Sequence, residues 1–294
     1  MASLFIKGTA LVTHESYKDD PTCLGSYLLC AMETWVMRNF ANTGEFTVEY
    51  PNEVKRKYGE VRAANEAFQN DIHNLIIGYH QMKHVIDNAQ MESGLKGLYL
   101  GNLVEHYVTN IRCIYDHMAV FARVVADKRF LPQRNISTES LNALLKYIRS
   151  SESRAAEIFT EPVVKQLLSM ETSLQDIKTI RDAIIHDGKE PLITFSSGIP
   201  QIRINRSSYK RDESLLPDLL NLGLLDYPMF PYLQQLSRVL FTDMERLGEE
   251  IITYFNTKDD AFRFELVALI GICVEEFISF LHGNYAVEPN TEFI

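Results

Sequence analysis

The segment IRDAIIHDG contains three residues that can handle a phosphate and a proton, namely Arg181, Asp182 and His186. A guanidinium can bind phosphate oxygens through two parallel hydrogen bonds and stays charged at every physiological pH. An imidazole can take up or release a proton near neutral pH. Cleavage of RNA by its own 2′-hydroxyl needs a base, an acid and a cation near the phosphorus, and no metal. These three residues are therefore our candidate catalytic residues.

The apolar spacing predicts that residues 173–186 form a helix that Gly188 ends. Residues five apart on a regular helix lie about 140° apart around its axis, so Arg181 and His186 do not stack. They can converge through the long arginine side chain, a distorted helix end or a second protomer, and we expect the second protomer. Asp182 and His186 share a face. Asp182 and the helix C-terminus both favour a protonated imidazole, which predicts an acid rather than a base.

A plainer interpretation of the same residues remains open. Arginine, aspartate and histidine at a helix end commonly form caps and surface ion pairs.

A second Arg-x-x-x-x-His pattern, Arg112 to His117, lies in the middle of another predicted helix. Arg112 and Asp116 are spaced for an ion pair, and a buried polar network between helices would account for them. The functional alternative is that Arg112, Asp116 and His117 brace the Arg181 motif from the neighbouring helix.

A local basic cluster follows the candidate site in this acidic chain. It consists of Arg203, Arg206, Lys210 and Arg211. The cluster can guide an RNA backbone, or it can be the charged edge of a solvated hairpin. Both interpretations stay open.

A rival set of histidines suggests a metal-binding helical bundle. His73, His80 and His84 lie on one helix face, with His106 or His117 on the next helix. Residues seven apart are about 10 Å apart along a helix, so only His80 and His84 can share an ion. Our first hypothesis therefore includes no metal and no cofactor.

The elements that must position these residues are mostly helical. Long apolar-periodic segments predict helices over 24–40, 52–90, 98–127 and 227–255, with Gly94 and Gly97 as the break between the second and third. Shorter helices are predicted over 140–149, with Ser137 as the N-cap, over 163–170 and over 259–281, and a strand over 45–50. The alternating segment 192–206 predicts a β-hairpin.

This pattern predicts an all-α fold in the main, a helical bundle with two long antiparallel helices, extra helices and one hairpin. We expect three parts: a mixed segment 1–52, a helical domain 53–258, and a C-terminal helix and tail 259–294.

Composition excludes several classes of protein. The chain has 294 residues, a net charge of −10 and 46% hydrophobic residues, which argues against broad electrostatic binding to nucleic acid. Its four cysteines form no C-x-x-C pair and predict buried free thiols. The first residues do not resemble a signal peptide, and the longest apolar run, 266–274, is too short to span a membrane. We expect a cytoplasmic protein.

The motif IRDAIIHDG resembles the signature of the HEPN superfamily (higher eukaryotes and prokaryotes nucleotide-binding), in which four residues separate Arg from His, often with Asn or Asp directly after the Arg. Arg181, Asp182 and His186 fill those positions. Tyr115, Asp116, His117 and Ala119 match a pattern that some poorly characterised HEPN families have on the preceding long helix. The resemblance spans about residues 60–255.

The resemblance implies a helical bundle that dimerises, with the Arg–His pairs of two protomers facing one another across a cleft. It implies a metal-independent endoribonuclease that cuts single-stranded RNA, in a toxin or defence system with a cognate inhibitor protein. Gly188 stands where one HEPN group has a modified tyrosine, so we do not expect that modification. The alternatives are a non-catalytic HEPN-like scaffold that binds RNA or protein, and the metal-binding bundle.

Overall fold

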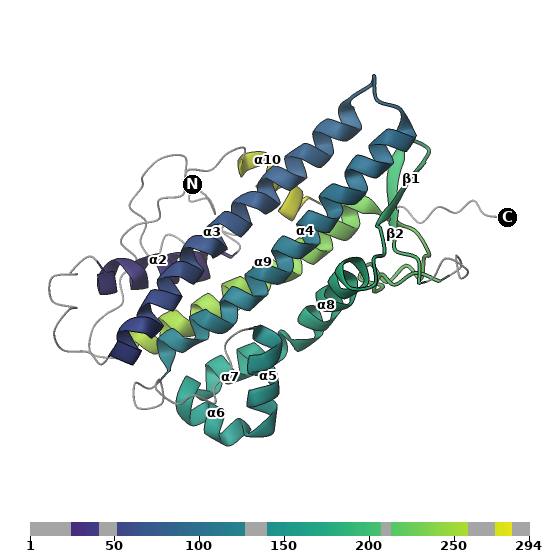
Figure 1. Ribbon diagram of the computed structural model, residues 1–294. Coiled ribbons are helices and arrows are strands. Elements are labelled where there is room, and N and C mark those ends of the chain that lie inside the picture. Colours follow the sequence, from purple (N-terminus) through teal and green to yellow (C-terminus); the bar gives the residue numbers. More distant parts are fainter. Residues whose placement is uncertain (1–24, 41–51, 127–139, 207–212, 258–273, 284–294) are drawn as a thin grey trace. The chain divides into compact units, whose positions relative to one another are not determined.

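The computed structural model describes residues 25–40, 52–126, 140–206, 213–257 and 274–283, and these are mainly helical (Figure 1). The helices are α2 (Ser26–Phe40), α3 (Asn52–Asp87), α4 (Ser93–Phe121), α5 (Leu141–Ser150), α6 (Glu152–Phe159), α7 (Glu161–Ser169), α8 (Glu171–Ile185), α9 (Met229–Asn256) and α10 (Val274–His282), with a 3-10 turn η1 (Ala122–Val125). The strands β1 (Leu192–Ser196), β2 (Ile199–Arg203) and β3 (Tyr227–Pro228) form one antiparallel sheet in that order. The prediction of a mainly α fold with one hairpin is confirmed.

The chain divides into two compact units. Unit 1 comprises 1–73, 113–174 and 240–272, and unit 2 comprises 74–112, 175–239 and 273–294. Helices α3, α4, α8 and α9 each contribute residues to both units. The three-part division expected from the sequence stays a prediction.

Unit 1 has a core of apolar side chains from most of its helices. Its large buried residues include Leu28, Met32, Trp35, Phe68, Ile72, Tyr115, Phe121, Leu144, Phe159, Leu167, Phe241 and Leu247. Helix α2 lies so close to α9 that a Cβ on Gly248 would be 2.1 Å from the backbone nitrogen of Leu28. This contact requires a residue without a side chain on α9.

Unit 2 has its own core. Its buried residues include Leu75, Tyr79, Met82, Val104, Tyr107, Ile177, Ile180, Ile193, Ile202, Tyr232, Leu233, Phe277 and Phe280. The Tyr107 hydroxyl donates to Ser237 Oγ at 2.6 Å, and that serine hydroxyl donates to the Leu233 carbonyl oxygen at 2.7 Å. Burial raises the pKa of Tyr107, which therefore stays a hydrogen-bond donor linking α4 to α9.

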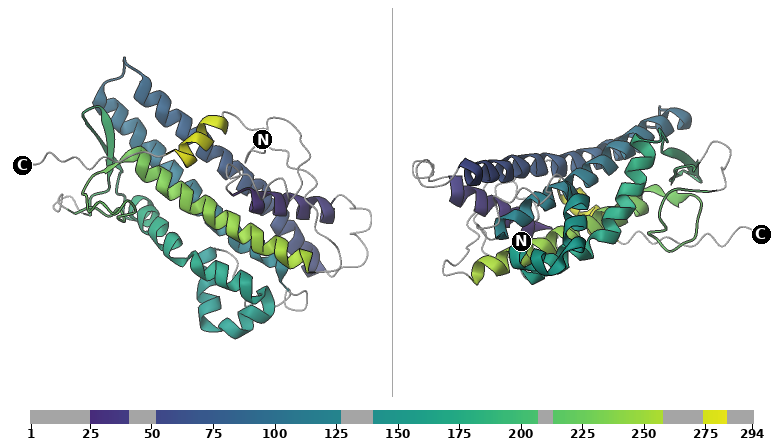
Figure 2. Two further views of the ribbon diagram at one scale, coloured as in Figure 1. Left: turned by 180° about the vertical axis from the view of Figure 1, so that it is seen from behind. Right: turned by 60° about the horizontal axis from the view of Figure 1, so that its bottom comes forward.

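The sheet packs on α4 through two glycines. A Cβ on Gly97 would lie 2.8 Å from the Ile193 carbonyl oxygen, and one on Gly101 would lie 2.7 Å from that of Pro191. Side chains at these positions would push β1 away, since real Cβ atoms do not approach a backbone oxygen so closely. Figures 1 and 2 show β1 and β2 beside the first turns of α4.

The hairpin turn explains the Ser-Ser-Gly sequence. Ser197 has φ 48° and Gly198 has φ 81°. Positive φ at both central residues is the type I′ arrangement, whose twist matches that of paired strands. The register pairs Ser196 with Ile199, so the predicted hairpin is confirmed. The short strand β3 was not predicted, because two residues give no periodic pattern.

Helix α10 rests on the α3 residues of unit 2, as the yellow helix in Figure 2 shows. The ring of Tyr79 lies 5.7 Å from that of Phe277 and 4.5 Å from that of Phe280. Glu276 pairs with Lys83 and lies 3.3 Å from Nδ1 of His80.

Most predicted helices are present, with two corrections and two segments that cannot be compared. Helix α4 begins at Ser93, so Gly94 and Gly97 lie inside it and do not break it; the break is at 88–92. Helix α6 was not predicted. The strand expected over 45–50 and most of the helix expected over 259–281 lie outside the described residues. Ser137, the expected cap of α5, also lies outside them, and Ser140 is the residue that caps α5 in the structure.

Candidate functional site

The candidate site lies at the C-terminal end of α8, in unit 2. The amide of Asp187 donates to the Asp182 carbonyl oxygen at 3.2 Å, and that of Lys189 donates to the Ala183 carbonyl oxygen at 3.0 Å. The amide of His186 keeps the regular four-residue bond to the same Asp182 oxygen at 2.9 Å, so the helix departs from regular geometry only after His186, where the bonds span five and six residues. Gly188 allows this end because its φ is 62°.

One chain brings the three predicted catalytic residues together. Arg181 Nη1 lies 2.8 Å from His186 Nε2 and 3.0 Å from Asp182 Oδ1. Asp182 Oδ1 lies 3.8 Å from His186 Nε2. The long arginine side chain suffices for this, since His186 still makes a regular helical hydrogen bond, and a second protomer is not required to bring Arg181 to His186.

The contact between Arg181 and His186 determines which imidazole nitrogen is free of a proton. A guanidinium can only donate hydrogen bonds, so the contact is a hydrogen bond when His186 Nε2 carries no proton. In that tautomer the ring proton is on Nδ1. The tautomer suits a base that takes a proton at Nε2, and the acid expected from Asp182 and the helix dipole stays a prediction.

The cluster is accessible to solvent. The exposed fractions are 33% for the Arg181 side chain, 37% for Asp182 and 63% for His186. A phosphate can therefore reach Arg181 without any change in the backbone.

Arg112, Asp116 and His117, the residues proposed to brace the Arg181 motif, lie on α4. In unit 1, Asp116 Oδ1 accepts from the amide of Leu141 at 2.9 Å and so caps α5. His117 Nε2 lies 3.0 Å from Asp71 Oδ2 on α3. Arg112 is half-buried on α4 and belongs to unit 2. The contacts of Asp116 and His117 join helices within unit 1, and a role for the three in bracing Arg181 stays a prediction.

The basic cluster after the site is partly neutralised. Arg203 Nε lies 3.3 Å from Asp226 Oδ1, and Arg206 Nη1 lies 2.9 Å from Glu213 Oε2. Lys210 and Arg211 lie outside the described residues. A phosphate contact by Arg203 or Arg206 would have to compete with a carboxylate.

The histidines of the rival hypothesis have separate surroundings. His80 pairs with Glu276, His84 and His106 are exposed, and the Nε2 of His73 is buried with no hydrogen-bond partner. Burial lowers the pKa of His73. Among the residues that the structure describes, no three histidine, cysteine, aspartate or glutamate side chains gather as a metal site would require.

Sequence analysis missed a buried carboxyl group in unit 1. Asp243 on α9 is 5% exposed and accepts a hydrogen bond from the Tyr115 hydroxyl at 2.8 Å. Burial raises the pKa of Asp243 to about 6, although hydrogen bonds from Tyr115 and Ser173 and the charge of Arg246 oppose the shift. The tyrosine two residues after Ile-Arg-Cys was matched as part of a family pattern, but nothing in the sequence paired it with Asp243.

We expect Asp243→Asn to remove a pH dependence of stability. The folded pKa of about 6 exceeds an unfolded value of about 3.9, so the native state binds the proton more tightly. This contribution to stability is complete below pH ~4 and is lost as the pH rises through ~6. Urea unfolding of the wild type should give a free energy of unfolding that falls by up to about 3 kcal/mol from this group over that range. A variant with the same pH profile as the wild type would contradict this account.

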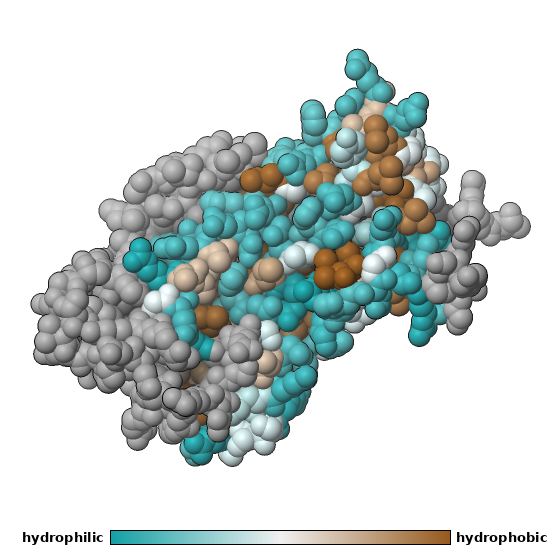
Figure 3. All heavy atoms as spheres, viewed as in Figure 1, coloured by the Kyte–Doolittle hydropathy of each residue, from teal (hydrophilic) through white to brown (hydrophobic). Residues whose placement is uncertain are grey.

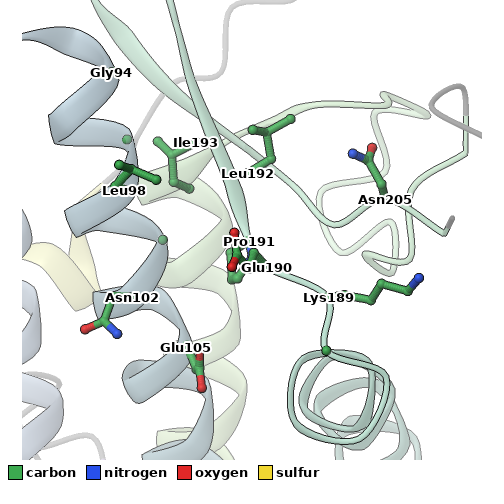
Figure 4. Close-up of a pocket in the computed structure, with 13 residues that line it drawn as sticks. Gly94, Leu98, Asn102, Glu105, Lys189, Glu190, Pro191, Leu192, Ile193 and Asn205 are labelled. Carbon is green, nitrogen blue, oxygen red and sulfur yellow. The ribbon is translucent and has the colours of Figure 1, made fainter. Parts of the chain in front are cut away.

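A pocket of about 690 Å³ was also not predicted from the sequence. It lies in unit 2, between the glycine-bearing face of α4 and the segment that follows α8 (Figure 4). Its lining comprises Gly94, Gly97, Leu98, Gly101, Asn102, Glu105, Gly188, Lys189, Glu190, Pro191, Leu192, Ile193 and Asn205. The sequence signal for this pocket is the spacing of Gly94, Gly97 and Gly101. Glycines three and four residues apart place backbone without side chains on one face of a helix.

Comparison of the chain with protein-family models, with curated proteins and with solved structures finds no match in any of the three. The HEPN resemblance therefore depends on the motif residues alone. No helix within the described part of the chain has the length and apolar content to cross a membrane.

Proposed function

We propose that the chain is a HEPN-like, metal-independent endoribonuclease that cuts single-stranded RNA with Arg181 and His186. The observation that supports this most is the 2.8 Å contact between Arg181 Nη1 and His186 Nε2 on an exposed helix end. A phosphate-binding cation and a proton acceptor thus lie within the span of one phosphodiester.

In the proposed reaction, a phosphate oxygen replaces His186 as the acceptor for the Arg181 guanidinium. His186 Nε2, released from that bond, takes the proton of the RNA 2′-hydroxyl. The 2′-oxygen attacks phosphorus, the bond to the 5′-oxygen breaks, and the leaving oxygen takes a proton from an acid. The products are a 2′,3′-cyclic phosphate and a 5′-hydroxyl. Asp182 positions Arg181, which it contacts at 3.0 Å.

The acid is the reason to propose a homodimer. One chain supplies a single histidine at this helix end, whereas the reaction uses a base and an acid in one step. A protonated His186 from a second copy would supply the acid. A cytoplasmic toxin or defence role with a cognate inhibitor remains part of the proposal and depends on the family resemblance.

Arg181→Ala tests the role of the cation. We expect kcat/KM for a single-stranded RNA in excess chelator to fall about 10²- to 10³-fold, because the charge that develops on the phosphoryl oxygens loses its donor. Arg149→Ala is the matched control, since Arg149 is an exposed arginine paired with Glu171 in unit 1. Cleavage by Arg181→Ala at the wild-type rate would contradict the proposal.

One observation favours the second candidate, a non-catalytic RNA-binding scaffold. Arg181 Nη1 already satisfies both Asp182 and His186, so the cluster is complete as a structural unit. Wild-type protein that binds single-stranded RNA and leaves it intact would support this candidate and overturn the enzyme.

A further inference from the structure

The pocket beside the candidate site belongs to the same unit and adjoins the site along the chain. Gly188 lines the pocket and follows His186 by two residues, which an extended chain spans in about 7 Å. Its volume of about 690 Å³ lies within the range of small-molecule sites. A pocket of this size can hold one nucleobase.

The pocket wall combines apolar and polar parts. Leu98 on α4 and Leu192 and Ile193 on β1 supply aliphatic surface. Figure 4 shows Leu98 projecting from α4 toward β1 and Glu105 further along the same helix, whereas the Asn102 side chain turns away from β1. Apolar side chains of this kind can hold the faces of an unstacked base, and polar groups can recognise its edge.

The charge of the lining selects against phosphate. Glu105 and Glu190 are carboxylates, and neither forms an ion pair among the described residues. The single cation of the lining, Lys189, extends away from α4 in Figure 4. A site with two carboxylates and one ammonium attracts hydrogen-bond donors more than anions.

Glu105 supplies the carboxylate on the α4 side of the pocket, whereas the Asn102 amide turns away from β1 in Figure 4. A carboxylate can accept a hydrogen bond from an exocyclic amino group. Cytosine and adenine each carry such an amino group. Uracil presents a carbonyl oxygen where cytosine has its amino group, and a carbonyl facing Glu105 would place two acceptors together.

We propose that an RNA whose phosphate contacts Arg181 places a neighbouring cytosine or adenine base in this pocket, with Glu105 accepting a hydrogen bond from the amino group of that base. The inference depends on the proposed function, since it assigns the base specificity of that enzyme.

Five-nucleotide oligocytidine and oligouridine test this inference, because their bases differ only in the groups at the recognised edge. Fluorescence anisotropy with the His186→Ala variant, which should not cut, should show oligocytidine binding about tenfold more tightly. Glu105→Gln should reduce this preference. Leu98→Trp should fill the pocket and bring the two affinities within about twofold, given that the two RNAs share every phosphate contact.

Leu95→Trp is the matched control. Leu95 is exposed on the same helix and does not line the pocket, so this variant should keep the preference. Equal binding of the two RNAs by the parent protein, a preference that survives Leu98→Trp, or no binding of either RNA would overturn the inference. If the wild type prefers oligocytidine through the pocket but does not cleave RNA, the base-binding proposal stands and the nuclease proposal is wrong. If it cleaves RNA without a preference between the two bases, the nuclease proposal stands and the base-binding proposal is wrong.

Discussion

His186→Ala should lose about 10²- to 10⁴-fold of the RNA cleavage rate, the range that one positioned proton-transfer group contributes. His186 supplies the lone pair at Nε2, and Arg181 and Asp182 have no group that can replace it near neutral pH. The measurement is a single-turnover rate on labelled single-stranded RNA in excess chelator.

Binding and a control variant make this result specific. The dissociation constant for RNA should change only a few fold, because Arg181 remains to contact phosphate. His84→Ala, which removes an exposed histidine from α3 in the same unit, should cut like the wild type. A His186→Ala rate within about threefold of the wild type would exclude His186 as the base, since one such group contributes at least about 100-fold.

Gly248→Ala should be the most destabilising small substitution in unit 1. Its Cβ would lie 2.1 Å from the Leu28 nitrogen and 2.4 Å from the Tyr27 carbonyl carbon. These are backbone atoms of α2 and cannot move aside as a flexible side chain would. Overpacking of a core costs about 1–3 kcal/mol or more, and we expect about 3 kcal/mol or more here.

Gly59→Ala is the matched comparison for this substitution. Gly59 is an exposed position within α3, and a Cβ there meets no atom within 4 Å. Alanine should stabilise this helix by about 0.5–1 kcal/mol. Urea unfolding should therefore shift the two midpoints in opposite directions with the slope unchanged. A Gly248→Ala midpoint equal to that of the wild type would show that α2 does not pack on α9 as closely as described.

Helical periodicity alone predicted most elements, since α3, α5, α8 and α9 each have a continuous apolar stripe. It failed where tertiary contacts override local preference. Gly94 and Gly97 reduce helix propensity and were interpreted as a break, but Gly97 lies inside α4 because β1 needs a bare backbone there. That requirement comes from a strand nearly 100 residues later, which no local window includes.

Helical periodicity also predicted part of the candidate site. The spacing of Asp182 and His186 gave their proximity, which the 3.8 Å separation confirms. The contact of Arg181 with His186 depends on the reach of the arginine side chain, since the amide of His186 keeps the regular bond to the Asp182 carbonyl oxygen. The spacing of the two residues does not determine that side-chain conformation, so the sequence favoured a second protomer.

The chemical identity of the RNA ends tests the central claim most directly. Wild-type protein should cut single-stranded RNA in excess chelator and leave a 2′,3′-cyclic phosphate and a 5′-hydroxyl, and a single 2′-deoxy substitution should block cleavage at that position. Products with a 5′-phosphate, or cleavage that continues at the 2′-deoxy position, would contradict the account, because neither can arise from attack by the 2′-oxygen.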